Sequence, residues 1–320
     1  MAALLLQELR FIGAVERKAQ AAKLHLRNHD LLVLPDVVVK RHDVAPRLAT
    51  NTLVSPVFGR DQIGARQLDL LARTVGREGA DGFATSIAGD TFARSEFIPW
   101  LLRELGSRRV HFSDSHRRPV WFLAVDEKFY FGFPRFNFHD APGRTIARER
   151  EASLPPVVAA AMVFAAKPAS NEMIFDPVVG TGTILAEAAQ MAPGAQLIGS
   201  DIDPAAVAMA RKSLAHVRGV RLFHQDSTSA HLSGPSITLT LANLPFGKQH
   251  KSSYGNRALY EAVLRRSLER AAPTWRAILL TSDEESLRSA VGSIGTLELS
   301  TVTSIKVRGQ PATIWSLRRS

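Results

Sequence analysis

From about residue 155 to its end, the chain alternates helical and strand-like segments at regular spacing. This alternation is typical of βαβ units, which place parallel strands in one sheet and helices on both of its faces. The final strand-like runs, 296–307 and 311–318, are separated only by the three residues "RGQ". They must form an antiparallel hairpin, because a parallel crossover needs about a dozen residues. The pattern predicts an α/β fold with a Rossmann-like, seven-stranded sheet that has an antiparallel last strand.

The region before this alternation is less regular. Helical patterns at 66–76 and 95–107 and strand-like runs at 31–39 and 120–133 indicate a smaller α+β domain. Residues 135–151 mix aromatics, arginines and a Pro-Gly turn, and we interpret them as the connection between two domains. We therefore expect an N-terminal α+β domain over 1–145 and a second domain over 146–320.

Composition narrows the class of protein. The 320 residues carry a net charge of +10, mostly as arginine, so nucleic acid is the first partner to consider. Cysteine is absent, which excludes disulfides, a thiolate metal site and a cysteine nucleophile. The histidines have no metal-ligand spacing, so we expect no metal. No apolar run reaches the length of about 20 residues that a membrane span requires, and we expect a cytoplasmic protein.

The run "IFDPVVGTGTILAEAA" predicts a ligand-binding turn. It places Asp176 at the end of a strand and Gly180 and Gly182 in a tight turn before a helix. Glycines there let the backbone approach a ligand, and the helix N-terminus presents free N–H groups. A dinucleotide fingerprint would have a third glycine where Leu185 stands, which argues against a pyrophosphate.

The next two strands end in acidic residues. Asp201 in "GSDIDP" is placed to accept hydrogen bonds from both ribose hydroxyls. Ile202 is expected to pack against an adenine face, and Asp226 to accept a hydrogen bond from its amino group. Any one of these carboxylates is also explained as a helix N-cap, but their order along the chain favours a nucleoside site.

A fourth strand-like run ends in "LANLPFGKQH", which begins at Leu241. The buried run would deliver Asn243 to the carboxyl edge of the sheet, where α/β folds bind ligands. A structural Pro-Phe-Gly turn would explain the motif if it stood alone, but the nucleoside site upstream favours a functional role.

In this order, "DPVVGTGT", "GSDIDP", "HQD" and "NLPFG" resemble the motifs of class I S-adenosylmethionine-dependent methyltransferases that methylate amino groups. "RERE-ASLPPVVAAAMVFAA" and the ending "VRGQPATIWSLRR" look more narrowly like the THUMP-associated RNA guanine-N2 methyltransferases. The resemblance covers about 145–320. For residues 1–145, where it is poor, a diverged THUMP-like RNA-binding module is one interpretation. Val179 and Leu244 depart from the family pattern, and neither change removes a required polar group.

The resemblance implies S-adenosylmethionine as the cofactor and RNA, most plausibly tRNA, as the partner. In such an enzyme the Asn243 side-chain oxygen and the Leu244 carbonyl would accept both protons of the target amine, which turns its lone pair toward the methyl group. Pro245 would stiffen the loop and Phe246 would stack on the flipped base. The expected cofactor-binding residues are Asp176, Pro177, Gly180, Gly182, Thr183, Asp201, Ile202, Asp226 and Asn243. The expected RNA-binding residues are Lys248, Lys251, Arg144 and Arg148.

Guanine N2 is the substrate atom that the resemblance implies. The same clamp suits adenine N6 in RNA or DNA, or the side-chain amide of a protein glutamine, and the sequence does not mark the walls of the base pocket. A non-catalytic RNA-binding protein that retains the methyltransferase fold is a further alternative. The intact set Asp201, Asp226 and Asn243 argues against it, because an inactive site has no chemical reason to keep these polar groups.

Overall fold

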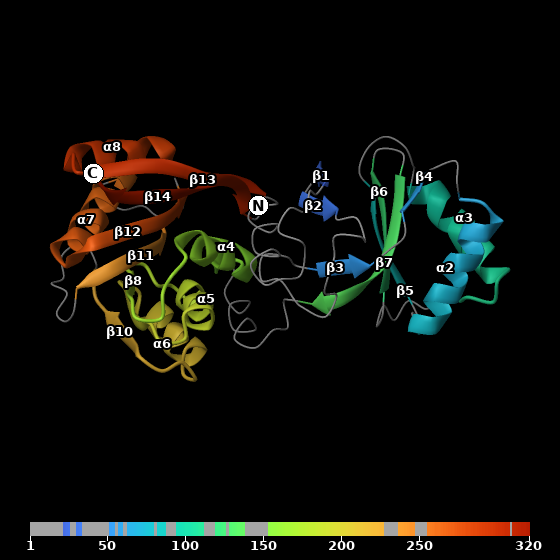
Figure 1. Cartoon of the computed structure of the whole chain (residues 1–320), viewed down its shortest axis with the longest axis horizontal. Coiled ribbons are helices and arrows are strands. Elements are labelled where there is room, and N and C mark those ends of the chain that lie inside the picture. The colour runs from blue at the N-terminus through green and yellow to red at the C-terminus, as the bar shows by residue number, and fades with distance from the viewer. Residues whose placement is uncertain are drawn as a thin grey trace. The chain divides into compact units, whose positions relative to one another are not determined.

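The structure is a computed structural model. It describes residues 22–25, 30–33, 51–54, 57–59, 63–79, 82–87, 94–111, 119–125, 128–137, 153–226, 236–246, 255–307 and 309–320. The chain separates into two compact units (Figure 1). One consists of Met1–Gly13, Pro46–Leu48 and His139–Ser320, and the other of Ala14–Ala45 and Ala49–Phe138.

The unit that contains His139–Ser320 is built on a seven-stranded sheet with the order β10-β9-β8-β11-β12-β14-β13. Its strands are β8 (Met173–Asp176), β9 (Gln196–Asp201), β10 (Val220–His224), β11 (Ile237–Asn243), β12 (Ala271–Thr281), β13 (Leu297–Val307) and β14 (Gln310–Arg319). The pairs from β10 to β12 are parallel, whereas β14 runs antiparallel to both β12 and β13. The α/β class, the sheet and its antiparallel last strand are therefore confirmed.

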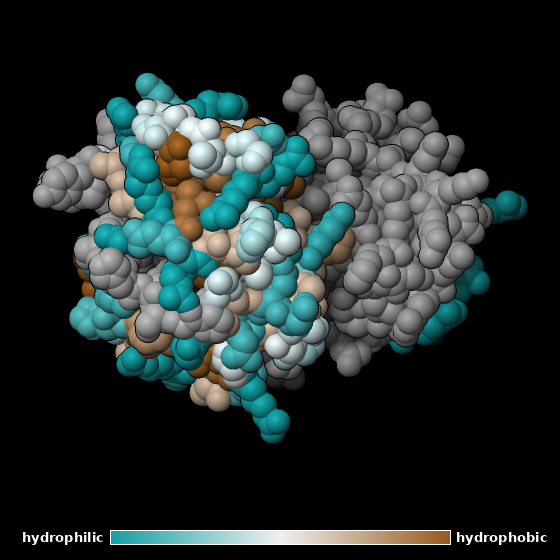
Figure 2. Space-filling model, turned by 60° about the vertical axis from the view of Figure 1, so that its left-hand side comes forward, coloured by the Kyte–Doolittle hydropathy of each residue, from teal (hydrophilic) through white to brown (hydrophobic). Residues whose placement is uncertain are grey.

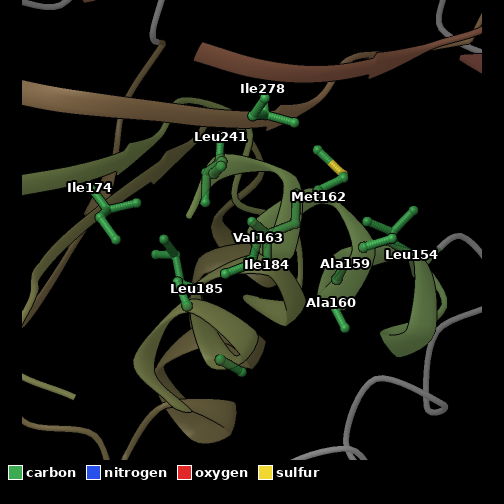
Figure 3. Close-up of a cluster of buried hydrophobic side chains, with 14 of the residues drawn as sticks. Leu154, Ala159, Ala160, Met162, Val163, Ile174, Ile184, Leu185, Leu241 and Ile278 are labelled. Carbon is green, nitrogen blue, oxygen red and sulfur yellow. The ribbon is translucent and has the colours of Figure 1, made fainter. Parts of the chain in front are cut away.

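Helices cover both faces of this sheet. They are α4 (Pro156–Ala166), α5 (Thr183–Met191), α6 (Pro204–Ser213), α7 (Gly255–Glu269) and α8 (Glu284–Ile294). Period-two burial in the strands sends alternate side chains into two separate cores. Residues of α4 and α5 pack with Ile174, Leu241 and Ile278 on one face (Figure 3), and residues of α7 and α8 pack with Phe175 and Leu279 on the other.

The boundary between α7 and β12 differs from the expected one. The apolar pattern predicts a helix that continues through Ala272, but α7 ends at Glu269 and β12 begins at Ala271. Ala271 pairs with Ile237 of β11, and the Ile237 N–H donates to the Arg270 carbonyl at 2.7 Å. Pairing with a neighbouring strand here overrides the helical propensity of alanine.

The other unit has a mixed sheet with two helices. The order is β3 (Asn51–Val54), β7 (Lys128–Asn137), β6 (Pro119–Val125) and β5 (Gly82–Ile87), and β4 (Val57–Gly59) also pairs with β7. The helices are α2 (Ala65–Glu78) and α3 (Arg94–Gly106), and β1 (Ala22–His25) pairs with β2 (Asp30–Val33). The expected helices at 66–76 and 95–107 are confirmed. The expected connection at 135–151 begins too early, because β7 extends to Asn137 and pairs there with Asn51.

Arg108 joins the two helices of this unit. Its Nε donates to Asp69 Oδ1 of α2 at 2.8 Å, and its Nη1 donates to Glu104 of α3 at 3.2 Å.

Within the described ranges, none of the helices combines the length and apolar character that a bilayer crossing requires.

Candidate active site

A glycine turn connects β8 to α5 at the carboxyl edge of the sheet. Gly180 and Gly182 have φ angles of +52° and +83°, which side-chain-bearing residues rarely adopt. A Cβ on Gly182 would also meet Leu214 Cδ1 at 3.1 Å and Ala210 Cβ at 3.3 Å. The second glycine is therefore required both by its backbone angles and by the close approach of α6.

Asp201, at the end of β9, holds this turn in place. Its Oδ2 accepts the Gly180 N–H at 2.8 Å and its Oδ1 accepts the Asp203 N–H at 3.0 Å. The two backbone amides fix the orientation of the carboxylate. Since a carboxylate oxygen has two acceptor positions, each oxygen can still accept one hydrogen bond from a ligand such as a ribose diol.

Asp176, at the end of β8, carries a buried oxygen that lacks a partner. The side chain is 1% exposed, its Oδ1 accepts the Val178 N–H at 3.1 Å, and its Oδ2 has no hydrogen bond among the described residues. Burial, together with the charge of Asp201, raises the pKa of Asp176 to about 8, against the effect of the Val178 hydrogen bond. Such an orphaned atom at a sheet edge indicates a position for a ligand.

Asn243 ends the neighbouring strand β11. Phe175 of β8 pairs with Thr240 of β11. β8 ends one residue after this pair, at Asp176, and β11 ends three residues after it, at Asn243. The Asn243 Oδ1 is shielded from solvent and has no hydrogen-bond partner among the described residues. Two adjacent strands thus each bring an unpartnered buried oxygen to the same edge of the sheet.

The residues after Asn243 are held by the protein. The Leu244 N–H donates to the Leu280 carbonyl of β12 at 2.9 Å, and the Leu244 side chain is buried. The Pro245 carbonyl accepts the Tyr260 hydroxyl of α7. Phe246 is half-buried and packs against the core that contains α4 and α5. The sequence motif therefore forms an ordered element between two helical layers.

Two apolar side chains are exposed near Asp201. Ile202, directly after β9, is 68% exposed, and Phe223 of β10 is 38% exposed. The pairing of His224 with Asp201 places the ends of these strands side by side, and the His224 ring nitrogen lies 3.1 Å from the Ile202 carbonyl. Asp226 follows two residues after β10. Exposed apolar side chains next to carboxylates suit a flat heterocycle.

Three buried hydroxyls line the start of α5. Ser153 Oγ lies 3.1 Å from Thr181 Oγ1, which lies 3.2 Å from Thr183 Oγ1. Pro177, which was also expected in the site, is buried at the beginning of the same turn. These hydrogen bonds connect Ser153, in the segment before α4, to the glycine turn.

Sequence reasoning missed Ser153, Phe223 and Tyr260. Phe223 could have been noticed as an aromatic residue within a strand next to the acidic Asp226, but Ser153 and Tyr260 carry no local signal. The expected RNA-binding residues Lys248, Lys251, Arg144 and Arg148 lie outside the described residues.

Much of the arginine charge in the described part of this unit is paired. Arg265 bonds Glu261, Arg266 bonds Glu269, Arg288 bonds Glu284 and Arg318 bonds Glu298, all at 2.6 to 2.8 Å. On the face seen in Figure 2, hydrophilic and apolar residues are interspersed. Ion pairs at or near the surface contribute little to stability, and they leave these arginines partly neutralised.

Comparison with known proteins decides the family. Residues 144–310 match the family described as RMKL-like, methyltransferase domain. The chain belongs to this methyltransferase family. The matched range contains the glycine turn, Asp201 and the Asn243–Phe246 motif.

Two tRNA methyltransferases are similar to this RMKL-like chain over part of their length. It is 28% identical over 194 residues to the tRNA (guanine(6)-N(2))-methyltransferase THUMP3 of Bos taurus, covering 55% of this chain and 38% of that protein. It is 30% identical over 142 residues to the tRNA (guanine(6)-N2)-methyltransferase of Thermus thermophilus, covering 43% and 42%. The matched region thus spans about two fifths of the length of each of these relatives.

The fold is similar to that of a solved structure over the whole chain. TrmN from Thermus thermophilus superimposes with a TM-score of 0.78 at 22% identity, covering 100% of this chain and 96% of that one. At this identity the likeness shows the fold.

Proposed function

We propose that this chain is an S-adenosylmethionine-dependent RNA methyltransferase that acts on the exocyclic N2 amine of guanine in tRNA. The observation that carries the proposal is the shielded, unpartnered Oδ1 of Asn243, next to a strand that ends in the unpartnered Oδ2 of Asp176. The relatives named as tRNA guanine-N2 methyltransferases support the choice of base and of RNA.

The residues at the sheet edge fit the cofactor. Asp201 offers two oriented oxygens for a ribose diol, and Ile202 and Phe223 offer apolar surface for adenine. Asp176 offers a buried acceptor for the ammonium group of the cofactor's amino-acid part. Asp226 offers an acceptor for the adenine amine. When bound, S-adenosylmethionine supplies a methyl group activated by a sulfonium sulfur.

Asn243 and Leu244 would prepare the amine for attack. The lone pair of an exocyclic amine is delocalised into the base, so the nitrogen is a poor nucleophile. Two acceptors, Asn243 Oδ1 and the Leu244 carbonyl, hold both amine protons and turn the lone pair out of the base plane. A strong base would not be needed before attack, because the N–H proton would become acidic only as the new C–N bond replaces the methyl–sulfur bond, and solvent would then take that proton.

RNA recognition is assigned to other parts of the chain. We infer a THUMP-like RNA-binding domain over residues 1–145 and a methyltransferase domain over 146–320. Phe246 would stack on the flipped guanine, while Lys248, Lys251, Arg144 and Arg148 would contact phosphates. A cytoplasmic location accords with this substrate and with the absence of cysteine.

The test is to identify the methylated nucleoside. The purified 320-residue chain is incubated with labelled S-adenosylmethionine and tRNA that lacks guanine-N2 methylation, and the digested RNA is analysed by mass spectrometry. N2-methylguanosine is the expected product. N6-methyladenosine would keep the clamp but overturn the choice of base, and cofactor binding without any methylated nucleoside would contradict the enzymatic proposal.

Two asparagine variants make the assignment specific. Asn243→Ala should lower the methylation rate by about 10²-fold or more while tRNA affinity stays within about twofold, because one of the two acceptors is lost. Asn171→Ala is the control, since Asn171 is exposed and precedes β8 at the opposite end of that strand. Equal activity of the two variants would contradict the role of Asn243.

A further inference from the structure

Tyr260 is a buried hydroxyl that the clamp alone does not explain. It lies on α7, is 0% exposed, and belongs to the core on that face of the sheet together with Ala242 and Leu244. Its hydroxyl is 2.5 Å from the Pro245 carbonyl oxygen and 2.8 Å from Thr281 Oγ1. The Tyr260 side chain thus contacts the backbone of the Asn243–Phe246 motif from the face of the sheet that α7 covers.

The direction of each hydrogen bond follows from its end groups. The Pro245 carbonyl can only accept, so the Tyr260 hydroxyl donates its proton there. Thr281 must therefore donate to Tyr260, and Thr281 Oγ1 in turn accepts the Asp283 N–H at 3.0 Å. This row of hydrogen bonds begins at the Asp283 N–H, passes through the two hydroxyls and ends at the Pro245 carbonyl. Every hydrogen bond in the row therefore points the same way.

This direction excludes Tyr260 as a base for the reaction. A tyrosine hydroxyl must lose its own proton to become an effective base, and here that proton is donated to the Pro245 carbonyl. Burial, with a smaller effect of the Asp283 charge, raises the pKa of Tyr260 to about 12 despite the Thr281 hydrogen bond, so the phenol stays neutral. What remains for the hydroxyl is to hold Pro245.

Holding Pro245 confines the Leu244 carbonyl. The proline ring fixes its own φ angle, and a residue before proline is restricted to extended conformations. The Leu244 N–H is bonded to Leu280 of β12 on one side, and the Pro245 carbonyl is bonded to Tyr260 on the other. The peptide that carries the Leu244 carbonyl is therefore restrained at both ends.

The same turn after β12 also holds the start of α7. Asp283 Oδ2 accepts from Asn256 Nδ2 at 2.8 Å, and its Oδ1 accepts the Ser286 N–H at 3.0 Å as the N-cap of α8. Thr281 is thus connected through Tyr260 to Pro245, which precedes residues 247–254. Asp283 is connected to Asn256, which follows them.

We propose that Tyr260, oriented by Thr281, is a positioning residue that sets the direction of the Leu244 carbonyl acceptor in the methyl-transfer site. The inference rests on the proposed function, because it assigns a role within that reaction. It requires that removal of the hydroxyl slow the chemical step without weakening cofactor binding.

Tyr260→Phe removes only the hydroxyl. The single-turnover rate of methyl transfer to tRNA should fall about 10- to 10²-fold, since a misplaced acceptor costs on this order, while the Kd for S-adenosylmethionine stays within about twofold. The matched control is Ser267→Ala, because Ser267 is a fully buried residue on the same helix whose hydroxyl donates to the Val263 carbonyl within that helix. A rate for Tyr260→Phe equal to that of the control overturns the proposal.

A second pair of variants separates positioning from a loss of folding. Thr281→Val removes the donor that orients Tyr260 and should lower the rate in the same direction, whereas Thr281→Ser keeps the hydroxyl and should restore most of it. A merely structural role would instead lower Tm and cofactor affinity together with the rate. Failure of Thr281→Ser to exceed Thr281→Val would also overturn the proposal.

Amide hydrogen exchange makes the outcome independent of the substrate. If the wild-type chain methylates no nucleoside, the proposed function fails, but amide exchange at residues 241–244 and 246 still reports on the clamp. Faster exchange there in Tyr260→Phe than in Ser267→Ala supports the positioning role. Equal exchange in the two variants contradicts it.

Discussion

The Asp201 carboxylate accepts the backbone N–H of Gly180, with 2.8 Å between Oδ2 and the nitrogen. This bond links the ends of β9 and β8 across the sheet edge, so the same side chain shapes the glycine turn and offers oxygens to a ligand. The second oxygen is oriented by the Asp203 N–H. If Asp201 binds the cofactor as proposed, ligand binding and turn geometry are coupled through one residue.

Replacing Asp201 should weaken cofactor binding more than folding. Asp201→Asn keeps the shape but puts an NH₂ group where one oxygen accepted, so affinity for S-adenosylmethionine should fall at least about tenfold, measured by calorimetry. Asp203→Asn is the control, because Asp203 caps α6 by accepting the Ala205 N–H and asparagine is an equally good N-cap. Equal affinity of the two variants would contradict the assignment.

Gly182→Ala should destabilise the protein by about 1–3 kcal/mol. The φ angle of +83° strains any side-chain-bearing residue, and the new Cβ would press on Leu214 and Ala210 of the neighbouring helix. Gly292→Ala provides the contrast, because Gly292 lies within α8 with open space around a Cβ, and alanine there should stabilise by about 0.5–1 kcal/mol. Urea unfolding of the two variants measures both effects, and a stable Gly182→Ala protein would disprove the packing argument.

The ligand-free protein should lose stability through Asp176 as pH rises from about 4 to about 8. Burial raises the pKa of Asp176 to about 8 in the folded state, so within this window the unfolded chain is ionised while the folded one holds a proton. The contribution is fully present below the unfolded pKa and is lost as pH rises through the folded one. Asp176→Asn removes it.

Thermal unfolding between pH 5 and pH 8.5, without ligand, checks this prediction. Relative to wild type, Asp176→Asn should gain in Tm as pH rises, by about 2–4 °C for each kcal/mol. Parallel pH profiles for the two proteins would show that Asp176 titrates in the folded state as it does in the unfolded chain.

Arg276→Ala should destabilise the protein by about 1–3 kcal/mol. Arg276 bonds both carboxylate oxygens of Glu172, at 2.6 and 3.0 Å, and donates to the Ala166 carbonyl at the end of α4. Although burial alone raises the pKa of Glu172, its hydrogen bonds with Arg276 and the Ala169 N–H hold that pKa below its usual value. Losing the arginine leaves a partly buried carboxylate and helix end unpaired.

The comparison for this variant is an exposed pair. Arg318→Ala breaks the Arg318–Glu298 pair, whose side chains are 74% and 51% exposed, and should change stability by less than about 1 kcal/mol. Denaturant midpoints of the two variants check the difference. If Arg318→Ala destabilised the protein as much as Arg276→Ala, the burial of an ion pair would not determine its contribution to stability here.

Local sequence signals located much of the candidate site. Gly180 and Gly182 were recognisable because a strand followed by a Gly-Thr-rich run and an apolar helix is a pattern of neighbouring residues. The side chains of Asp201 and Asn243 were placed at the sheet edge because each ends an apolar strand. The parallel order of these strands follows from the helices between them, which makes this edge a meeting point for their ends.

The α/β alternation, the final hairpin and the polar residues at the strand ends could be predicted without a structure, since all of these depend on residues close together in the chain. Three features appear only in the folded chain: β14 lies between β12 and β13, Ala271 joins a strand, and the Tyr260 hydroxyl reaches the Pro245 carbonyl. These features arise when segments distant in sequence pair or pack. Their energies depend on the partner in space, which no local pattern records.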